Sequence, residues 1–245
     1  TPWPGGVAFH RSPETTGYTL KAIASAPAII GTTLDDLAAG PEWRIDFANT
    51  FRVRIESGEL ASVTRIQMLS GQNIAALGTA TGIWEIVQFE TATLVAPRTY
   101  RLAGLLRGQA GSELAMPGVL PAGARFVLVD GALARVGLTL DDVGLPFNWK
   151  VGPSRRDLGD PSYLQTAHTF RGEGLKPLSP VHVRAARDGA GNIALTWLRR
   201  TRSGGAFWTT AATRRASRAR TSRRATGAGR SSPRRPSTRR AGTAS

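Results

Sequence analysis

Acidic side chains are the first residues of this chain that could do chemistry, because a glycosidase needs two carboxyl groups flanking the bond that it breaks. Two adjacent pairs, Asp35-Asp36 and Asp141-Asp142, supply such groups. Each pair follows a Thr-Leu dipeptide. Thr followed by acids is typical of the first turn of a helix, where the helix dipole favours negative charge. We therefore expect both pairs to cap short helical turns, in residues 32–40 and 138–143, rather than to catalyse.

The remaining candidates for catalysis or metal binding are isolated. Glu85 alternates with Trp84 and Ile86, so we expect it to face solvent from a half-buried strand. The chain has no cysteine, and no Asp or Glu stands at metal-ligand spacing beside its three histidines, which are His10, His168 and His182. No nucleotide-binding, metalloprotease or serine-hydrolase motif is present. We predict no catalytic residue, no cofactor and no metal site, and we do not expect an enzyme.

Binding residues are easier to propose than catalytic ones. In "LLRGQAGSE" (105–113), Arg107 and Gln109 could lie in an exposed loop that contacts a partner subunit or a surface glycan, since Gly permits close approach and Arg offers a forked donor. The favoured interpretation is a turn whose glycines adopt positive φ, with Arg107 tied to an acidic neighbour. Trp3, Trp43 and Trp149 lie near turns and could stack on sugars, although core packing is commoner for Trp.

The candidate residues lie within or beside short runs in which apolar and polar residues alternate. These runs predict a mainly β fold. Phe51, Val53 and Ile55 alternate with charged residues, and "LASVTRIQML" (60–69) is predicted to be another strand. Residues 83–108 are predicted to form three strands, the second ending at Pro97. Asp130-Gly131 between apolar runs predicts a hairpin. Two further strands are expected in "PFNWKVGP" (146–153) and "YLQTAHTFRG" (163–172), with a turn-rich connection over 152–162.

The predicted domain organisation divides the chain into four parts. Residues 1–171 form a β-rich module, an antiparallel barrel or sandwich, and residues 172–180 form a linker. Residues 181–208 contain a hairpin that starts a fibronectin III-like sandwich but stops short of its seven strands. We expect residues 177–208 not to form a stable domain, because an isolated two-stranded hairpin is marginal in water.

The last part, residues 209–245, holds 11 Arg, no acidic residue, and only Thr, Ala, Arg, Ser, Gly and Pro. Such a composition predicts a disordered tail. An Arg arm of this kind could bind nucleic acid nonspecifically, but it lacks aromatic residues that stack on bases, and a nucleic-acid partner is not expected. No apolar run is long enough to predict a membrane span. The chain begins on Thr1, which we interpret as a piece of a longer or processed protein.

Several stretches resemble one family. "YRLAGLLRGQAGSE" (100–113), preceded by "SGQNIAALG" (70–78) and "GIWEIVQF" (82–89), resembles the C-terminal region of the large baseplate protein of gene transfer agents and related tailed phages, the megatron or host-specificity tail protein. "PWPGGVAFHRS" (2–12) and residues 172–202 resemble the same family. The resemblance implies a β-rich module of a long tail-tip protein, whose upstream glycoside-hydrolase-like domain this sequence does not contain.

The sequence departs from the family after about residue 205, where further alternating strands are expected but the Arg-rich string begins. Its residue types are those that GC-rich codons give out of frame, so we hypothesise a frameshift near codon 205. The resemblance implies a structural tail-tip component that engages other tail or baseplate proteins, or a host surface glycan, in a particle made in the bacterial cytoplasm. The alternatives are a carbohydrate-binding accessory module of a cell-wall glycosidase and an Arg-tailed nucleic-acid binder.

Overall fold

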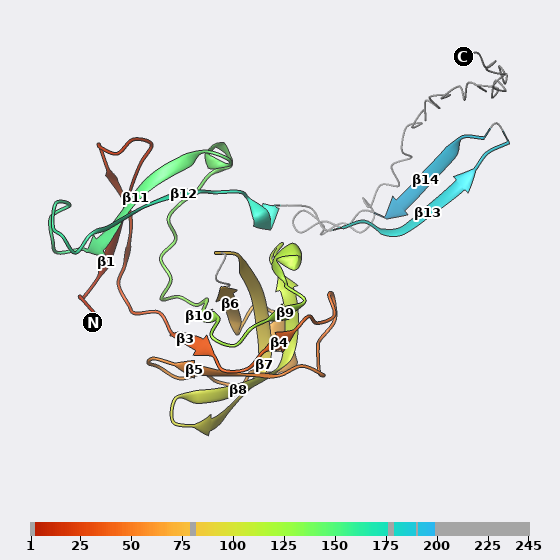
Figure 1. Ribbon diagram of the computed structural model, residues 1–245, viewed down its shortest axis with the longest axis horizontal. Coiled ribbons are helices and arrows are strands. Elements are labelled where there is room, and N and C mark those ends of the chain that lie inside the picture. The colour runs from red at the N-terminus through yellow and green to blue at the C-terminus, as the bar shows by residue number, and fades with distance from the viewer. Residues whose placement is uncertain (1–2, 79–81, 176–178, 190, 199–245) are drawn as a thin grey trace, which may run out of the picture. The chain divides into compact units, whose positions relative to one another are not determined.

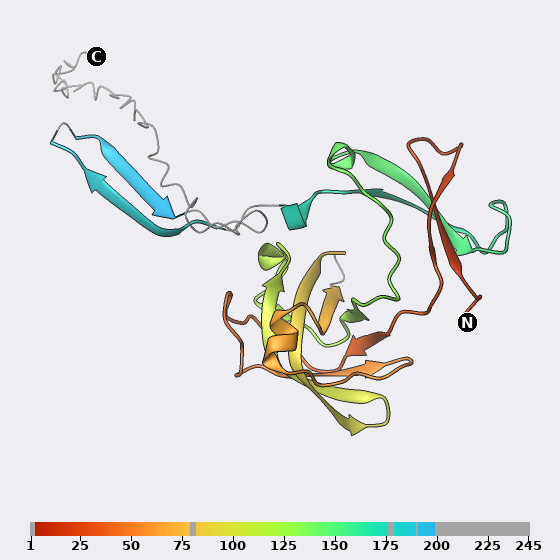
Figure 2. The ribbon, with the colours of Figure 1, turned by 180° about the vertical axis from the view of Figure 1, so that it is seen from behind.

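The computed structural model describes residues 3–78, 82–175, 179–189 and 191–198 of the chain. The chain divides into two compact units, Thr1–Leu178 and Ser179–Ser245 (Figures 1 and 2). The 209–245 tail and the frameshift position lie outside the described residues. Within the described ranges, no helix combines the length and apolar character that crossing a bilayer requires.

The first unit is built mainly from strands, as predicted. They are β1 Val7–Ser12, β2 Thr19–Ala24, β3 Ile30–Thr33, β4 Leu37–Ala38, β5 Phe51–Ile55, β6 Ile74–Gly78, β7 Trp84–Ala96, β8 Thr99–Gln109, β9 Val119–Leu120, β10 Arg125–Leu128, β11 Pro146–Pro153 and β12 Leu164–Thr169. Helical segments are short: α1 Arg65–Leu69 and the 3₁₀ turns η1 Glu113–Ala115, η2 Leu140–Asp142 and η3 Glu173–Leu175.

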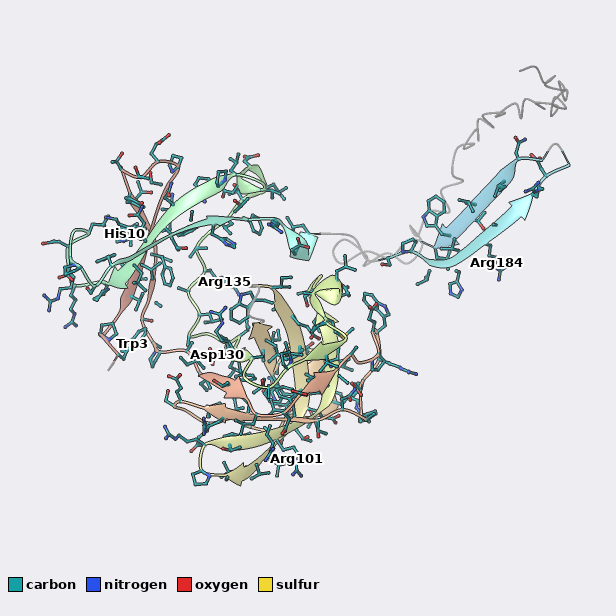
Figure 3. The ribbon with its side chains drawn as sticks, viewed as in Figure 1. Trp3, His10, Arg101, Asp130, Arg135 and Arg184 are labelled. Atoms are coloured by element: carbon teal, nitrogen blue, oxygen red, sulfur yellow. The ribbon has the colours of Figure 1, made fainter. Side chains whose placement is uncertain are left out.

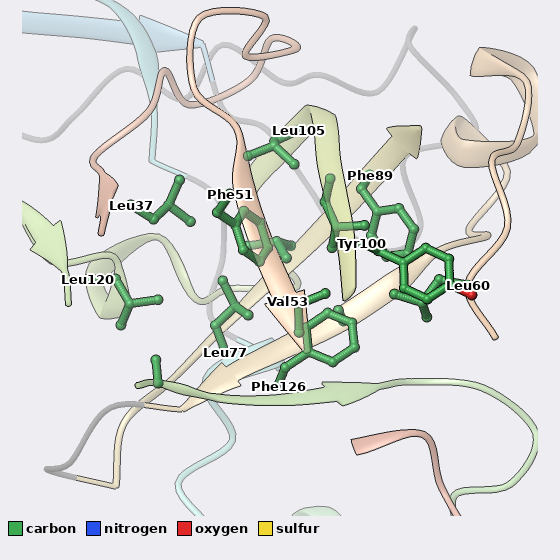
Figure 4. Packing of buried hydrophobic residues seen from close by; sticks show 14 of the residues in the cluster. Leu37, Phe51, Val53, Leu60, Leu77, Phe89, Tyr100, Leu105, Leu120 and Phe126 are labelled. Atoms are coloured by element: carbon green, nitrogen blue, oxygen red, sulfur yellow. The ribbon is translucent and has the colours of Figure 1, made fainter. Parts of the chain in front are cut away.

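Six of these strands close into an antiparallel barrel in the order β10-β3-β5-β8-β7-β6. The alternation in β5 works as predicted: Phe51, Val53 and Ile55 are buried while the two arginines between them are exposed. The buried residues form one apolar core inside the barrel, in which Phe51, Phe89 and Phe126 are fully buried (Figure 4). Closure leaves every barrel strand with two neighbours, so the barrel has no open edge.

A second sheet in this unit has the order β12-β11-β1-β2 and is antiparallel throughout. Its strands β11 and β12 are those predicted from residues 146–153 and 163–172. The predicted turn-rich connection between them is present, with Asp160 accepting hydrogen bonds from the backbone N–H and the hydroxyl of Ser162 at 2.9 and 2.6 Å.

The second unit contains an antiparallel hairpin of β13 Val181–Arg187 and β14 Ile193–Leu198. Asp188 and Asn192 close its turn: the Asn192 backbone N–H donates to Asp188 Oδ1 at 2.8 Å. This hairpin is the one predicted from the sequence. Most of its large apolar residues are exposed, including Val183 at 60% and Ile193 at 47%, whereas Val181 and Trp197 are half-buried.

Four predictions of local structure are wrong. Residues 60–69 contain the helix α1 rather than a strand, because Thr64 and Gln67 form a capping box in which the Thr64 backbone N–H donates to Gln67 Oε1 at 2.8 Å. Residues 84–96 form one continuous strand, β7, where two were predicted. Residues 32–40 form β3 and β4 rather than a helical turn, and Leu37 is buried in the barrel core.

The fourth error concerns Asp130-Gly131, which makes a turn but no hairpin. The reason is the closed barrel. The preceding strand, β10, already pairs with β3 along one edge and with β6 along the other. No hydrogen-bonding edge is left for a strand that would follow the turn.

Candidate functional site

A buried ion pair lies at the end of the barrel where β8 finishes and β7 begins. Arg107 Nε donates to Glu85 Oε1 at 2.7 Å and Nη2 donates to Oε2 at 2.9 Å, a bidentate arrangement. Arg107 Nη1 donates to the Ala38 carbonyl at 2.7 Å, and the Gly108 backbone N–H donates to Glu85 Oε1 at 3.1 Å. Both charged residues are only 1% exposed. The pair therefore ties β4, β7 and β8 together inside the protein.

The expected solvent exposure of Glu85 is wrong. Glu85 points to the same face of β7 as Val87 and Phe89, and all three side chains are buried. Leu77, which pairs with Glu85 from the neighbouring strand β6, is buried as well. Arg107 reaches Glu85 from the neighbouring strand, which offsets the cost of burying a carboxylate. A partner arginine in the next strand was the sequence signal for this arrangement.

Arg107 is not a surface contact residue either, and the favoured interpretation of its segment describes the structure. Gly108 and Gly111 have φ of +58° and +91°, and Ala110 also has a positive φ of 54°. The turn after β8 is fixed by Ser112, whose Oγ accepts from the Ile86 backbone N–H at 2.8 Å and donates to the Gln109 carbonyl at 2.7 Å. Gln109 is half-buried and donates to the Arg107 carbonyl at 2.9 Å.

A groove of about 760 Å³ runs beside this turn. Its walls come from the start of β7, the turn after β8 and η1, and the residues around the end of β12. The lining combines apolar side chains such as Trp84 and Phe170 with His168 and Arg171. The Arg125 guanidinium lies 4.9 Å from the centre of the Trp84 ring, so this indole already has a cationic neighbour.

A second surface feature is the loop between β4 and β5, which packs on the buried arginine. A Cβ on Gly40 would lie 2.9 Å from Arg107 Cγ, so only Gly fits at that point. Farther along the loop, Trp43 is 46% exposed and Phe47 is 65% exposed. A shallow hollow of about 560 Å³ is lined by residues of the same loop, from Pro41 to Asn49.

The predicted tryptophan contacts separate into exposed and buried residues. Trp3, labelled in Figure 3, is 39% exposed, and Trp43 is exposed as described. Trp149 is only 8% exposed, so its expected availability for sugar stacking is wrong. It lies on β11 beside Arg11, whose guanidinium is 5.9 Å from the Trp149 ring and 4.2 Å from the Phe147 ring, and the sheet buries it.

The acidic pairs have structural partners. The Asp35 carboxylate accepts hydrogen bonds from Arg52 Nη2 at 2.6 Å and from the Arg52 backbone N–H at 2.8 Å. These hydrogen bonds hold the pKa of Asp35 below its ordinary value. Asp36 accepts the Ala122 backbone N–H at 2.8 Å, so neither residue caps a helix. Asp142 does cap η2, as predicted: its Oδ2 accepts from the Thr139 backbone N–H at 2.8 Å.

The structure does not bring the histidines together with other ligands. The His10 ring lies on β1, 5.8 Å from the ring of Tyr163, and burial lowers the pKa of His10 (Figure 3). His168 lines the groove and His182 lies on β13. Among the described residues, no three His, Cys, Asp or Glu side chains gather closely enough to hold a metal ion.

The charge of the protein is distributed unevenly between the two units. Residues 1–178 contain 16 basic and 16 acidic residues, so the whole formal net charge of +15 comes from residues 179–245. The unit that holds the barrel is therefore neutral overall.

The comparison with protein families finds one match. Residues 28–127 match the family model described as "Rcc01698-like, C-terminal". This range starts just before β3 and ends at residue 127, so it covers five of the six barrel strands in full and β10 except its last residue, together with the turn after β8 and the loop that carries Trp43. No curated protein matches the chain.

Proposed function

We propose that this chain is a structural component of a phage or gene-transfer-agent tail-tip baseplate, contributing to assembly or host-surface attachment. The observation that carries the proposal is the family match, because it coincides with a complete structural module, the closed barrel. The family name in that match is associated with gene transfer agents, to whose large baseplate protein residues 100–113 bear the resemblance noted above.

The residues that carry this resemblance build the module. "YRLAGLLRGQAGSE" forms most of β8 and the turn after it, and supplies Arg107 to the buried ion pair and Leu102 and Leu105 to the core. These side chains stabilise the fold and are not available to bind a ligand. The barrel is therefore proposed to act as a rigid body in assembly.

The barrel unit also exposes large apolar side chains, which supports an interaction role. Leu114 is 92% exposed and Ile66 is 77% exposed, and each lies on a short helical segment outside the barrel wall. Contiguous exposed apolar side chains are typical of a surface that meets a partner, and Leu114 lines the groove together with Ile83, Trp84 and Phe170. We propose other tail or baseplate proteins as the partners, and the tail of the particle as the location.

Quantitative mass spectrometry of purified particles from the strain that carries this gene tests the proposal. Peptides from residues 1–178 should be present at a constant ratio to the tail tube protein across independent preparations. Deletion of the gene should give particles with defective tail tips in electron micrographs, and the full chain supplied from a plasmid should restore them. Absence of the chain from intact particles would refute the proposal.

A further inference from the structure

Four titratable side chains gather around one face of the sheet β12-β11-β1-β2. His10 on β1 pairs with Lys150 on β11 in the strand register, so their side chains are neighbours on the same face. The ring centres of His10 and Tyr163 lie 5.8 Å apart, and the Lys150 ammonium lies 5.3 Å from the centre of the Tyr18 ring. We call His10, Tyr18, Lys150 and Tyr163 the histidine cluster; Figure 3 labels His10.

Two polar atoms of the histidine cluster are buried without a hydrogen-bond partner among the described residues. They are Nδ1 of His10 and the hydroxyl oxygen of Tyr18. Buried polar groups in folded proteins nearly always have a partner, because an unpaired one costs stability. An apolar side chain in place of His10 would avoid that cost, so packing alone does not account for a histidine here.

The other polar groups of the cluster are engaged with backbone carbonyls. The Lys150 ammonium donates to the Leu158 carbonyl at 3.3 Å, and the Tyr163 hydroxyl donates to the Pro153 carbonyl at 3.1 Å. An ammonium group can donate hydrogen bonds but cannot accept one. Lys150 therefore brings a positive charge next to His10 and no acceptor for a proton on the imidazole.

No carboxylate pairs with His10 in the described part of the chain. Leu20, which lies opposite His10 on β2, is apolar. Burial raises the pKa of Tyr163, and the charges of Asp157 and Asp160 raise it further, which places these two acids on the side of the tyrosine. Burial alone lowers the pKa of His10, so the acids do not compensate a charge on the imidazole.

Protonation of His10 would change the chemistry of its buried nitrogen. An uncharged imidazole can carry its proton on Nε2, which leaves only a lone pair at Nδ1. The imidazolium carries an N–H at Nδ1 as well, and that atom is buried without an acceptor among the described residues. A buried charge that has no partner is much costlier than an unpaired lone pair. Exposing the His10 ring to water relieves this cost.

We propose that His10 makes this sheet an acid-sensitive switch, in which protonation of the imidazole loosens the pairing of β1 with β11 while the closed barrel keeps its structure. An unfolded imidazole has a pKa of about 6.5, and burial lowers the pKa of folded His10 below that. The neutral imidazole therefore stabilises the sheet fully above about pH 6.5, and this stabilisation is lost progressively as the pH falls below it. The switch does not depend on the proposed role in a tail tip.

Amide hydrogen exchange of the purified full chain at about pH 7.5 and about pH 5.5, corrected for the intrinsic effect of pH on exchange, measures this opening. At the lower pH an exposed imidazole is about 90% charged, so protonation can favour the open sheet by up to about tenfold. Protection of the β1 and β11 amides should fall by about threefold to tenfold, and that of β5 and β8 by less than about twofold.

Two variants assign the effect to His10. In His10→Gln the difference in protection between the two pH values should disappear, because glutamine does not titrate. His168→Gln is the matched control, since it makes the same change at an exposed histidine on β12 of the same sheet, and it should keep the wild-type response. An equal response in wild type and His10→Gln, including no response in either, overturns the switch. An equal fall of protection in the sheet and in the barrel also overturns it.

A second measurement on the wild-type chain does not require a variant to fold. The NMR signals of the His10 ring, followed from about pH 8 to about pH 5, should show a titration midpoint below about 6.5, the value of an unperturbed histidine. A midpoint at or above about 6.5 would mean that the folded sheet accepts the charge, and the switch would be refuted.

Discussion

Removal of Arg107 should destabilise the barrel far more than removal of an arginine on its surface. In Arg107→Met, Glu85 keeps only the Gly108 N–H as a hydrogen-bond donor, at 3.1 Å, and remains 1% exposed in the native packing. The Ala38 carbonyl loses the donor that now lies 2.7 Å away. Breaking a buried pair by removing one partner costs about 3–5 kcal/mol, because the remaining charge is left uncompensated.

That free energy should be visible in thermal unfolding. For a folded unit of this size, each kcal/mol lowers the unfolding midpoint by about 2–4 °C, so Arg107→Met should lower it by about 6–20 °C. Circular dichroism of the full chain at neutral pH measures it. Glu85→Gln should act in the same direction, and the double variant should cost about 2–3 kcal/mol less than the sum of the two single variants, because the residues interact.

Arg52→Met is the control. Arg52 also makes a bidentate contact with a carboxylate, Asp35, but the two side chains are 47% and 31% exposed. Exposed pairs contribute about 1 kcal/mol or less. If Arg107→Met and Arg52→Met shifted the midpoint by the same amount, burial would not set the contribution of the Arg107–Glu85 pair, and the reasoning would be wrong.

Four further predictions test other parts of the molecule. Gly111→Ala should lower the free energy of unfolding, measured in urea, by about 2 kcal/mol or more, because a β-carbon there would collide with the Glu173 carbonyl oxygen. Gly123 has a similar φ of +90°, but a β-carbon there would meet no atom within 4 Å, so Gly123→Ala should lower the free energy of unfolding by less. Equal losses for the two variants would count against the packing argument. Hydrogen bonds from the Thr139 backbone N–H and from Arg11 hold the pKa of Asp142 below its ordinary value. The carboxylate therefore stabilises the fold above about pH 4, and this contribution is lost as the pH falls through the lower folded-state pKa. In Asp142→Asn the unfolding midpoint should fall less steeply on acidification than in wild type, and an equally steep fall would contradict this assignment. Amide protons of β13 and β14 should exchange with solvent much faster than those of the barrel strands, whereas strong protection across 181–198 would show that the hairpin is stable alone. Resequencing of codons 200–215 should show an alternative frame that continues after "RRTR" with alternating Val, Tyr and Glu-rich strands; without such a frame the frameshift hypothesis fails.

Local sequence patterns were enough to predict a strand whose one face is apolar and whose other face is polar. The alternation of Phe51, Val53 and Ile55 predicted β5 and its inward face, and Asp188 to Asn192 predicted the turn of the hairpin between β13 and β14. The short turn at Leu140–Asp142 followed from Thr139 and the acids after it. These features depend on residues within one or two turns of each other, so the sequence contains their causes.

The errors arose where a segment carried signals for both a helix and a strand, or where a residue distant in sequence determined the local structure. The Thr64–Gln67 capping box was present in the sequence, but apolar residues around it also suited a strand. The Asp130-Gly131 signal was real as a turn, yet no hairpin followed because β3 and β6 occupy both edges of β10. The candidate site was predicted least well for the same reason: Glu85 and Arg107 are 22 residues apart, and each neutralises the charge of the other in the interior.

The sequence by itself determined that the chain is mainly β and that positive charge is concentrated in residues 209–245, which hold 11 Arg and no acidic residue. Composition and period-two alternation are properties of short stretches of chain, which is why these features could be read directly. Only the tertiary structure decided which face of β7 is inside, that Arg107 is buried rather than available for binding, and that Trp43 is displayed. Those outcomes depend on barrel closure, which brings β4, β7 and β8 together and buries a charge only where its partner meets it.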